Sequence, residues 1–154
     1  MKNKLTERQI QLKFCEWLKY NYPEIIFQCD IASGMQLTQG QAILAKRMRS
    51  ERGNPDCFIA EPKTKEMEVV GNIMYTTCGL FIELKRDDIK IIRDKNARKI
   101  LKGETKLRKA GDFWDKHTEE QVEVMRRLSE KGYTCSFAIG LEDAKQLTIN
   151  YLNL

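Results

Sequence analysis

The chain has 154 residues, of which 42% are hydrophobic and 32% are charged, the ordinary composition of a soluble globular protein with one domain. No apolar run approaches the ~18 residues of a membrane span, and no apolar stretch follows the basic start, so we expect an intracellular protein without a secretory signal. The five cysteines are scattered and never spaced as C-x-x-C, which predicts reduced core residues.

The net charge of +5 is unevenly distributed along the chain. Between Lys85 and Lys116 there are twelve Lys or Arg residues against six Asp or Glu, whereas the rest of the chain has fifteen against sixteen. A phosphate backbone is one partner for such a segment, and solvent around a basic loop is the plain alternative.

The first expected element is a helix that begins after Thr6. Thr6 and Gln9 have the spacing of a capping box, and apolar residues recur at helical spacing until Tyr22-Pro23, where a helix must end. Glu7 lies in the first turn, beside the apolar face, and its residue type alone favours a charge that complements the helix dipole.

A strand is expected over 25–31, with Ile25, Phe27, Cys29 and Ile31 on one face, and a helix over 38–49 with a basic end. Gly53 ends this helix, and Pro55 forces an extended or turn conformation that leads Asp56 to the start of a strand over 57–60.

The residues 61–66 are expected to form a turn-rich connection, followed by one or two short strands around Gly71-Asn72. The central strand runs from Gly79 to Arg86. Residues 87–116 are interpreted as a basic arm, a helix with a flexible tip, or both.

The last part of the chain predicts a helix that begins with a second capping box at Thr118 and stops at Gly132, then a strand over 133–139 and a helix over 141–151. This order of elements predicts an α/β domain over 1–154, in which a mixed central sheet is flanked by helices and a basic insertion occupies about 87–116.

The central strand contains the candidate functional residues Glu83 and Lys85. Successive side chains of a strand alternate between its faces, so Glu83 and Lys85 point the same way while Leu84 packs on the other face. Such a pair is by itself an ordinary surface ion pair. Together with Asp56, Glu83 supplies carboxylate ligands for Mg²⁺ or Mn²⁺, and the Leu84 carbonyl is a candidate third oxygen. Lys85 would orient a water or stabilise developing charge.

Other chemistries are disfavoured. The single histidine, His117, lies in a charged segment before a helix and is interpreted as an exposed neighbour of the cap. No Gly-rich loop of the P-loop kind is present, which argues against an NTPase and against a nucleotide cofactor.

These residues resemble a known pattern. Pro55-Asp56 followed by Glu83-x-Lys85 resembles the PD-(D/E)xK nuclease motif, and the chain from about 5 to 145 is similar to the VRR-NUC (virus-type replication-repair nuclease) domain, in its stand-alone phage type. The similarity includes Glu7, Gln121 and Gly132-Tyr133. The long basic segment departs from it.

The resemblance implies a restriction-endonuclease-like core and a metal-dependent DNA endonuclease, a homodimer selective for branched DNA such as Holliday junctions. The implied active-site residues are Glu7, Asp56, Glu83, Lys85 and Gln121. The candidate DNA-binding residues are Lys46, Arg47, Arg86, Lys90, Arg93, Lys95, Arg98, Lys99, Lys106, Arg108 and Lys109. Two alternatives stay open, a catalytically silent DNA-binding module and an α/β domain without a nucleic acid function.

Overall fold

The computed structural model describes residues 5–31, 36–49, 52–67, 73–86, 98–100, 107–109 and 116–154. Its helices are α1 (Glu7–Asn21), α2 (Gln39–Met48), α3 (Lys116–Glu130) and α4 (Gly140–Leu152). Its strands are β1 (Phe27–Cys29), β2 (Cys57–Ile59), β3 (Lys63–Met67), β4 (Ile73–Thr77), β5 (Leu80–Lys85), β6 (Arg98–Ile100), β7 (Leu107–Lys109) and β8 (Thr134–Ile139). None of the helices in these ranges is long and apolar enough to cross a membrane.

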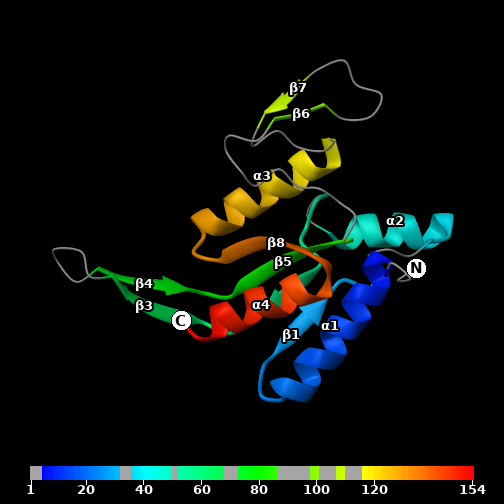
Figure 1. The fold of residues 1–154 in the computed structure, drawn as a ribbon. Helices are drawn as coiled ribbons and strands as arrows, with labels where there is room; N and C mark the ends of the chain where they lie inside the picture. Colours follow the sequence, from blue (N-terminus) through cyan, green and yellow to red (C-terminus); the bar gives the residue numbers. More distant parts are fainter. Residues whose placement is uncertain are drawn as a thin grey trace.

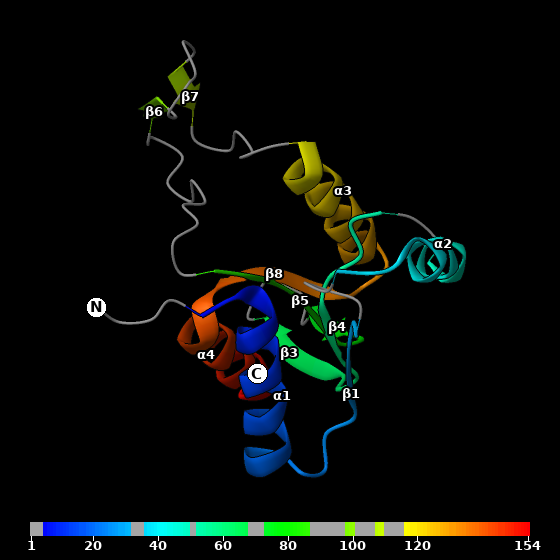
Figure 2. The ribbon, with the colours of Figure 1, turned by 90° about the vertical axis from the view of Figure 1, so that its right-hand side faces the viewer.

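The main sheet has the strand order β1-β2-β5-β8. β5 pairs antiparallel with β2 and parallel with β8, so the sheet is mixed. Helices α1 and α4 cover one face and α3 covers the other (Figure 2). The predicted fold class, a mixed sheet flanked by helices, is therefore confirmed, and β5 lies inside the sheet as expected (Figure 1).

The core lies between the sheet and α1 with α4. The apolar face of α1 contributes Ile10, Phe14 and Leu18, all fully buried, and β5 contributes alternate residues such as Ile82. Burying a side chain of this size stabilises the fold by about 1.5–3 kcal/mol. The capping box of Thr6 and Gln9 is present at the start of α1, as predicted.

α2 differs from α1 although it begins with the same kind of capping box, formed by Thr38 and Gln41. None of its residues is buried, and Ile43, Leu44 and Met48 are exposed. Both helices thus begin with the same local sequence signal, but only α1 packs buried residues against the core.

β3 and β4 form a separate two-stranded antiparallel sheet, which is paired from Lys63↔Thr77 to Met67↔Ile73. The prediction of a turn-rich connection over 61–66 is wrong here, because Lys63–Met67 form a strand whose partner supplies the hydrogen bonds that the sequence does not show. Gly71-Asn72 lie outside the described residues.

Other boundaries also differ from the predictions. β1 is shorter than the predicted strand over 25–31, because its pairing with β2 stops at Cys29, and Ile31 beyond it is 87% exposed. α3 begins at Lys116, so Thr118 lies inside its first turn and the predicted second capping box is wrong. In the basic segment, the described residues form the short antiparallel pair of β6 and β7, an arrangement that the sequence did not indicate.

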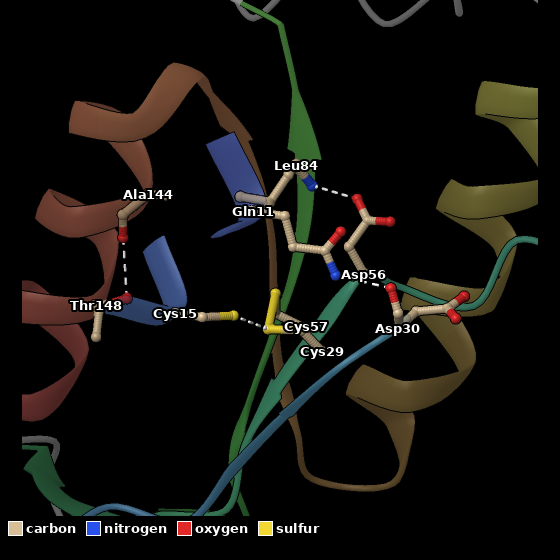
Figure 3. The surroundings of a disulfide bond; sticks show 9 residues. All are labelled: Gln11, Cys15, Cys29, Asp30, Asp56, Cys57, Leu84, Ala144 and Thr148. Atoms are coloured by element: carbon tan, nitrogen blue, oxygen red, sulfur yellow. Dashed lines mark hydrogen bonds between the residues drawn. A yellow bond between two sulfur atoms is a disulfide. The ribbon is translucent and has the colours of Figure 1, made fainter. Parts of the chain in front are cut away.

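Two cysteines depart from the expectation of reduced thiols. Cys29 and Cys57 are opposite each other in β1 and β2, with Cα atoms 4.1 Å apart, and form a disulfide bond (Figure 3). Cys15, Cys78 and Cys135 are free.

Candidate active site

The loop before β2 places Asp56 against β5. Gly53 has a φ of +84°, and a Cβ at this position would lie 2.9 Å from the backbone carbon of Glu120 in α3. A glycine is needed here because it adopts positive φ without strain and allows the two backbones to approach. The loop therefore leads Asp56 to a buried position, where its Oδ2 accepts a hydrogen bond of 2.8 Å from the Leu84 amide (Figure 3).

Glu83 and Lys85 meet side by side on β5, as the alternation of the strand predicts. Lys85 Nζ donates to Glu83 Oε1 over 2.9 Å, and both side chains are less than a tenth exposed. The contact is therefore a buried ion pair and not the surface pair that the residue types alone would suggest. Such a pair is retained only where further hydrogen bonds satisfy its members.

Gln121 supplies these hydrogen bonds from the first half of α3. Its Oε1 accepts from Lys85 Nζ over 2.8 Å, and its Nε2 donates to Glu83 Oε1. Because an ammonium can only donate, Lys85 determines which way the Gln121 amide points. The three buried side chains form one network, which we call the Glu83–Lys85–Gln121 cluster.

His117 extends this cluster by one helical turn. Its Nε2 lies 3.2 Å from Gln121 Nε2, and its Nδ1 lies 3.8 Å from Glu120 Oε2. Since Gln121 Nε2 is a donor, the contact requires an unprotonated Nε2 on the histidine. The interpretation of His117 as a neighbour of a cap missed this contact. Its spacing of four residues from Gln121 on one helix face was the available signal.

Burial raises the pKa of Glu83 to about 8, and the nearby charge of Asp56 acts in the same direction. Lys85 acts against this rise, and Glu7 adds to it. Glu7, in the first turn of α1, is therefore close enough to act on Glu83 through its charge. The structure brings together four of the predicted active-site residues, Asp56, Glu83, Lys85 and Gln121, while Glu7 acts on Glu83 only through its charge.

The oxygen atoms around Glu83 fit a hard divalent cation. Glu83 Oε2 is a buried oxygen without a hydrogen-bond partner in the structure, while Oε1 is taken by Lys85 and Gln121. An orphaned carboxylate oxygen next to a second acid is the arrangement that Mg²⁺ or Mn²⁺ would satisfy. No group of three His, Cys, Asp or Glu residues suited to a metal occurs within the described ranges, so water or phosphate oxygens would complete the coordination. A role for the Leu84 carbonyl stays a prediction.

The predicted DNA-binding residues are only partly described. Lys46 and Arg47 are exposed on α2, and Arg86 is exposed at the end of β5. Arg98, Lys99, Arg108 and Lys109 lie in β6 and β7, where the structure describes the backbone alone. Lys90, Arg93, Lys95 and Lys106 lie outside the described residues.

Comparison with known proteins supports the fold. A solved structure described as a VRR_NUC domain protein matches 97% of this chain and 90% of its own, with a TM-score of 0.54 and 20% sequence identity. No family model and no curated protein matches the chain. The chain therefore shares the fold of a VRR-NUC domain protein.

Proposed function

We propose that this chain is a metal-dependent DNA endonuclease of the VRR-NUC type, which hydrolyses phosphodiester bonds with Asp56 and Glu83 as metal ligands. The observation that carries the proposal is the orphaned Glu83 Oε2, buried beside Asp56 and next to an ammonium that Gln121 holds in place. The likeness in fold to a VRR_NUC domain protein agrees with this chemistry but does not establish it.

Each residue of the site has a separate task. Asp56 and Glu83 would hold a cation, which supplies Lewis acid stabilisation and a more acidic water when bound. Two of the three N–H donors of Lys85 are directed at Glu83 and Gln121, and the third is suited to an attacking water or a phosphate oxygen. Gln121 fixes the orientation of the Lys85 ammonium through its hydrogen bond. Glu7 adds negative charge, which favours binding of a cation at the site.

The test is cleavage of labelled four-way junction, flap and linear duplex DNA in Mg²⁺, Mn²⁺ or EDTA. We expect cutting with either metal and none in EDTA. Glu83→Gln and Lys85→Met should each lower the rate by about 10²–10³-fold or more, the loss typical for a residue that stabilises transition-state charge.

The chain offers a matched control pair. On α4, Lys145 Nζ donates to Glu142 Oε1 over 2.8 Å, and the Glu142 side chain is 83% exposed. Glu142→Gln and Lys145→Met make the same chemical changes outside the site and should cleave at the wild-type rate. DNA binding without cleavage in either metal would refute the nuclease and favour a catalytically silent DNA-binding module.

Within this proposal, the enzyme is an intracellular homodimer that prefers branched DNA in phage replication, recombination or repair. Two sites related by two-fold symmetry would cut opposing strands. The basic residues from Arg86 onward would bind phosphates. A sedimentation mass that stays monomeric at all protein concentrations would refute the dimer, and equal cutting of duplex and four-way junction would refute the preference.

A further inference from the structure

Three cysteines from three different elements meet under the active site. Cys29 of β1 is bonded to Cys57 of β2, and the thiol of Cys15 in α1 lies 3.3 Å from Cys29 Sγ (Figure 3). Cys29 is thus the central sulfur of the three, in contact with both of the others. Cys15 and Cys29 are partly exposed, whereas Cys57 is 1% exposed.

The register of the strands explains why Cys29 and Cys57 are so close. Asp30 donates its amide to the Asp56 carbonyl on one side of the cysteine pair, and Ala60 donates to the Ile26 carbonyl further along. Hydrogen-bonded and non-hydrogen-bonded pairs alternate in an antiparallel ladder, so Cys29 and Cys57 occupy a non-hydrogen-bonded pair, whose side chains are closer.

A second set of contacts holds Cys15 in place. Gln11, one helical turn before Cys15, is buried and donates to the Asp30 carbonyl over 2.8 Å. This bond joins α1 to the residue that follows Cys29. Glu7, Gln11 and Cys15 are four residues apart and therefore lie on one face of α1, which leads from the candidate active site to the three sulfurs.

We propose that Cys15, Cys29 and Cys57 form a thiol–disulfide relay, in which Cys29 bonds either to Cys57 or to Cys15. In the exchange, the Cys15 thiol loses its proton and its sulfur attacks Cys29 Sγ. The Cys29–Cys57 bond breaks, and the released Cys57 sulfur takes up a proton. One disulfide and one thiol are present before and after the step, so no oxidant or reductant is consumed.

The relay gives solvent thiols a route to a buried sulfur. An external thiol cannot reach Cys57 directly, but attack at the partly exposed Cys29, or exchange through Cys15, releases Cys57. The two bonded states differ in what they tie together. One joins β1 to β2 beside Asp56, and the other joins β1 to α1, the helix that carries Glu7. The thiols in solution would thereby change which segments are cross-linked, the one that holds Asp56 or the one that holds Glu7. The relay itself does not depend on the proposed nuclease activity.

The first test uses the wild-type chain, so it does not depend on whether a variant folds. The protein is oxidised with glutathione disulfide, denatured in excess N-ethylmaleimide, and digested for peptide mapping. We expect Cys29 to stay unlabelled, while label is divided between Cys15 and Cys57. Cys78 and Cys135, which are free, serve as internal references for complete labelling. Absence of label at Cys57 would overturn the relay.

Three variants sharpen the result. In Cys15→Ser, label at Cys57 should fall to background, because Cys57 then has no competitor for Cys29. In Cys57→Ser, a Cys15–Cys29 disulfide should form. In Cys29→Ser, Cys15 and Cys57 have both lost Cys29 as a disulfide partner, and both should be labelled. Labelling of both Cys15 and Cys29 in oxidised, folded Cys57→Ser would overturn the proposal.

A second measurement tests the reach of the relay into the site. The Leu84 amide donates a hydrogen bond to Oδ2 of Asp56, and Asp56 is the residue that precedes Cys57 in the sequence. We expect amide hydrogen exchange at Leu84 to be faster in the reduced protein than in the oxidised protein. An unchanged exchange rate would overturn the link between the cysteines and Asp56, whether or not the protein cleaves DNA.

Discussion

Two lysine–glutamate pairs in this molecule have almost the same geometry and opposite surroundings. Lys85 and Glu83 are 2.9 Å apart with side chains 9% and 4% exposed, whereas Lys145 and Glu142 are 2.8 Å apart with side chains 24% and 83% exposed. The buried pair has a third partner, Gln121, and burial raises the pKa of Glu83 to about 8. The comparison shows that distance alone does not decide what an ion pair does, because burial determines both its cost and its chemistry.

The largest expected difference comes from removing one partner of each pair. Lys85→Met leaves the buried Glu83 without its cation and should lower the free energy of unfolding by about 3–5 kcal/mol at pH 9, where Glu83 is ionised. At pH 6 the loss should be smaller, because Glu83 can hold a proton. Lys145→Met should cost less than about 1 kcal/mol at both values. Urea unfolding measures both, and equal losses for the two variants would contradict the comparison.

Removing the third partner should have the next largest effect. Gln121→Ala leaves buried donor and acceptor atoms of Lys85 and Glu83 unsatisfied, which costs about 1–3 kcal/mol. The control is Gln146→Ala on α4, where the amide bonds to Asn150 at the surface. Thermal unfolding should show a lower Tm for Gln121→Ala and little change for Gln146→Ala.

The pH dependence of the free energy of unfolding should distinguish Glu83 from Glu142. Glu83 has a pKa of about 8 in the fold against 4.5 as its ordinary value, so between these values the native state holds a proton that the unfolded state has lost. The free energy of unfolding should therefore fall as pH rises through this window, by up to about 1.4 kcal/mol per pH unit. The fall should stop above pH 8. Chemical unfolding in EDTA from pH 4 to 9 measures it.

Two substitutions check that assignment. Glu83→Gln should remove this fall in stability, since glutamine does not titrate. Glu142→Gln should leave it in place. A wild-type profile that is flat between pH 5 and 8, or one that Glu83→Gln does not alter, would show that Glu83 is ionised in the fold at neutral pH.

The smallest expected effect is the response to salt. A double-mutant cycle on Glu142 and Lys145 should give a coupling of about 0.3–0.5 kcal/mol that is largely lost in 1 M NaCl, where exposed charges are screened within about 3 Å. The coupling of Glu83 and Lys85 should persist at that salt, because solvent ions do not enter a buried pair. Loss of both couplings would indicate that the cluster is open to solvent.

The sequence predicted that Glu83 and Lys85 share one face of a strand, but it did not predict their burial or their surroundings. The alternation along β5 was sufficient to place Glu83 and Lys85 on one side, and the helical spacing predicted the apolar face of α1. The position of Asp56 beside Leu84 depends on the pairing of β2 with β5, which a single sequence indicates only through the resemblance to a known motif. Gln121 likewise entered through that resemblance, and the contact now shows what it does.

Other features were missed because they depend on register. Nothing in the sequence of Lys63–Met67 itself indicates a strand, because this strand depends on its hydrogen bonds to the partner strand β4. Cys29 and Cys57 are 28 residues apart in sequence, and only the antiparallel register brings them together. Thr118 and Gln121 have the spacing of a capping box, but the helix begins earlier and uses Gln121 to hold Lys85 instead.

The parallel pairing of β5 with β8 has a consequence for how the chain can change over evolutionary time. A parallel pair needs a crossover connection, and here the connection runs from Lys85 through β6, β7 and α3 to Thr134. The entropy of closing a connection grows only with the logarithm of its length, so doubling it costs about 0.6 kcal/mol. Residues can therefore be inserted or deleted directly after β5 without rebuilding the sheet. A change in the length of this connection would therefore leave Glu83 and Lys85 in place.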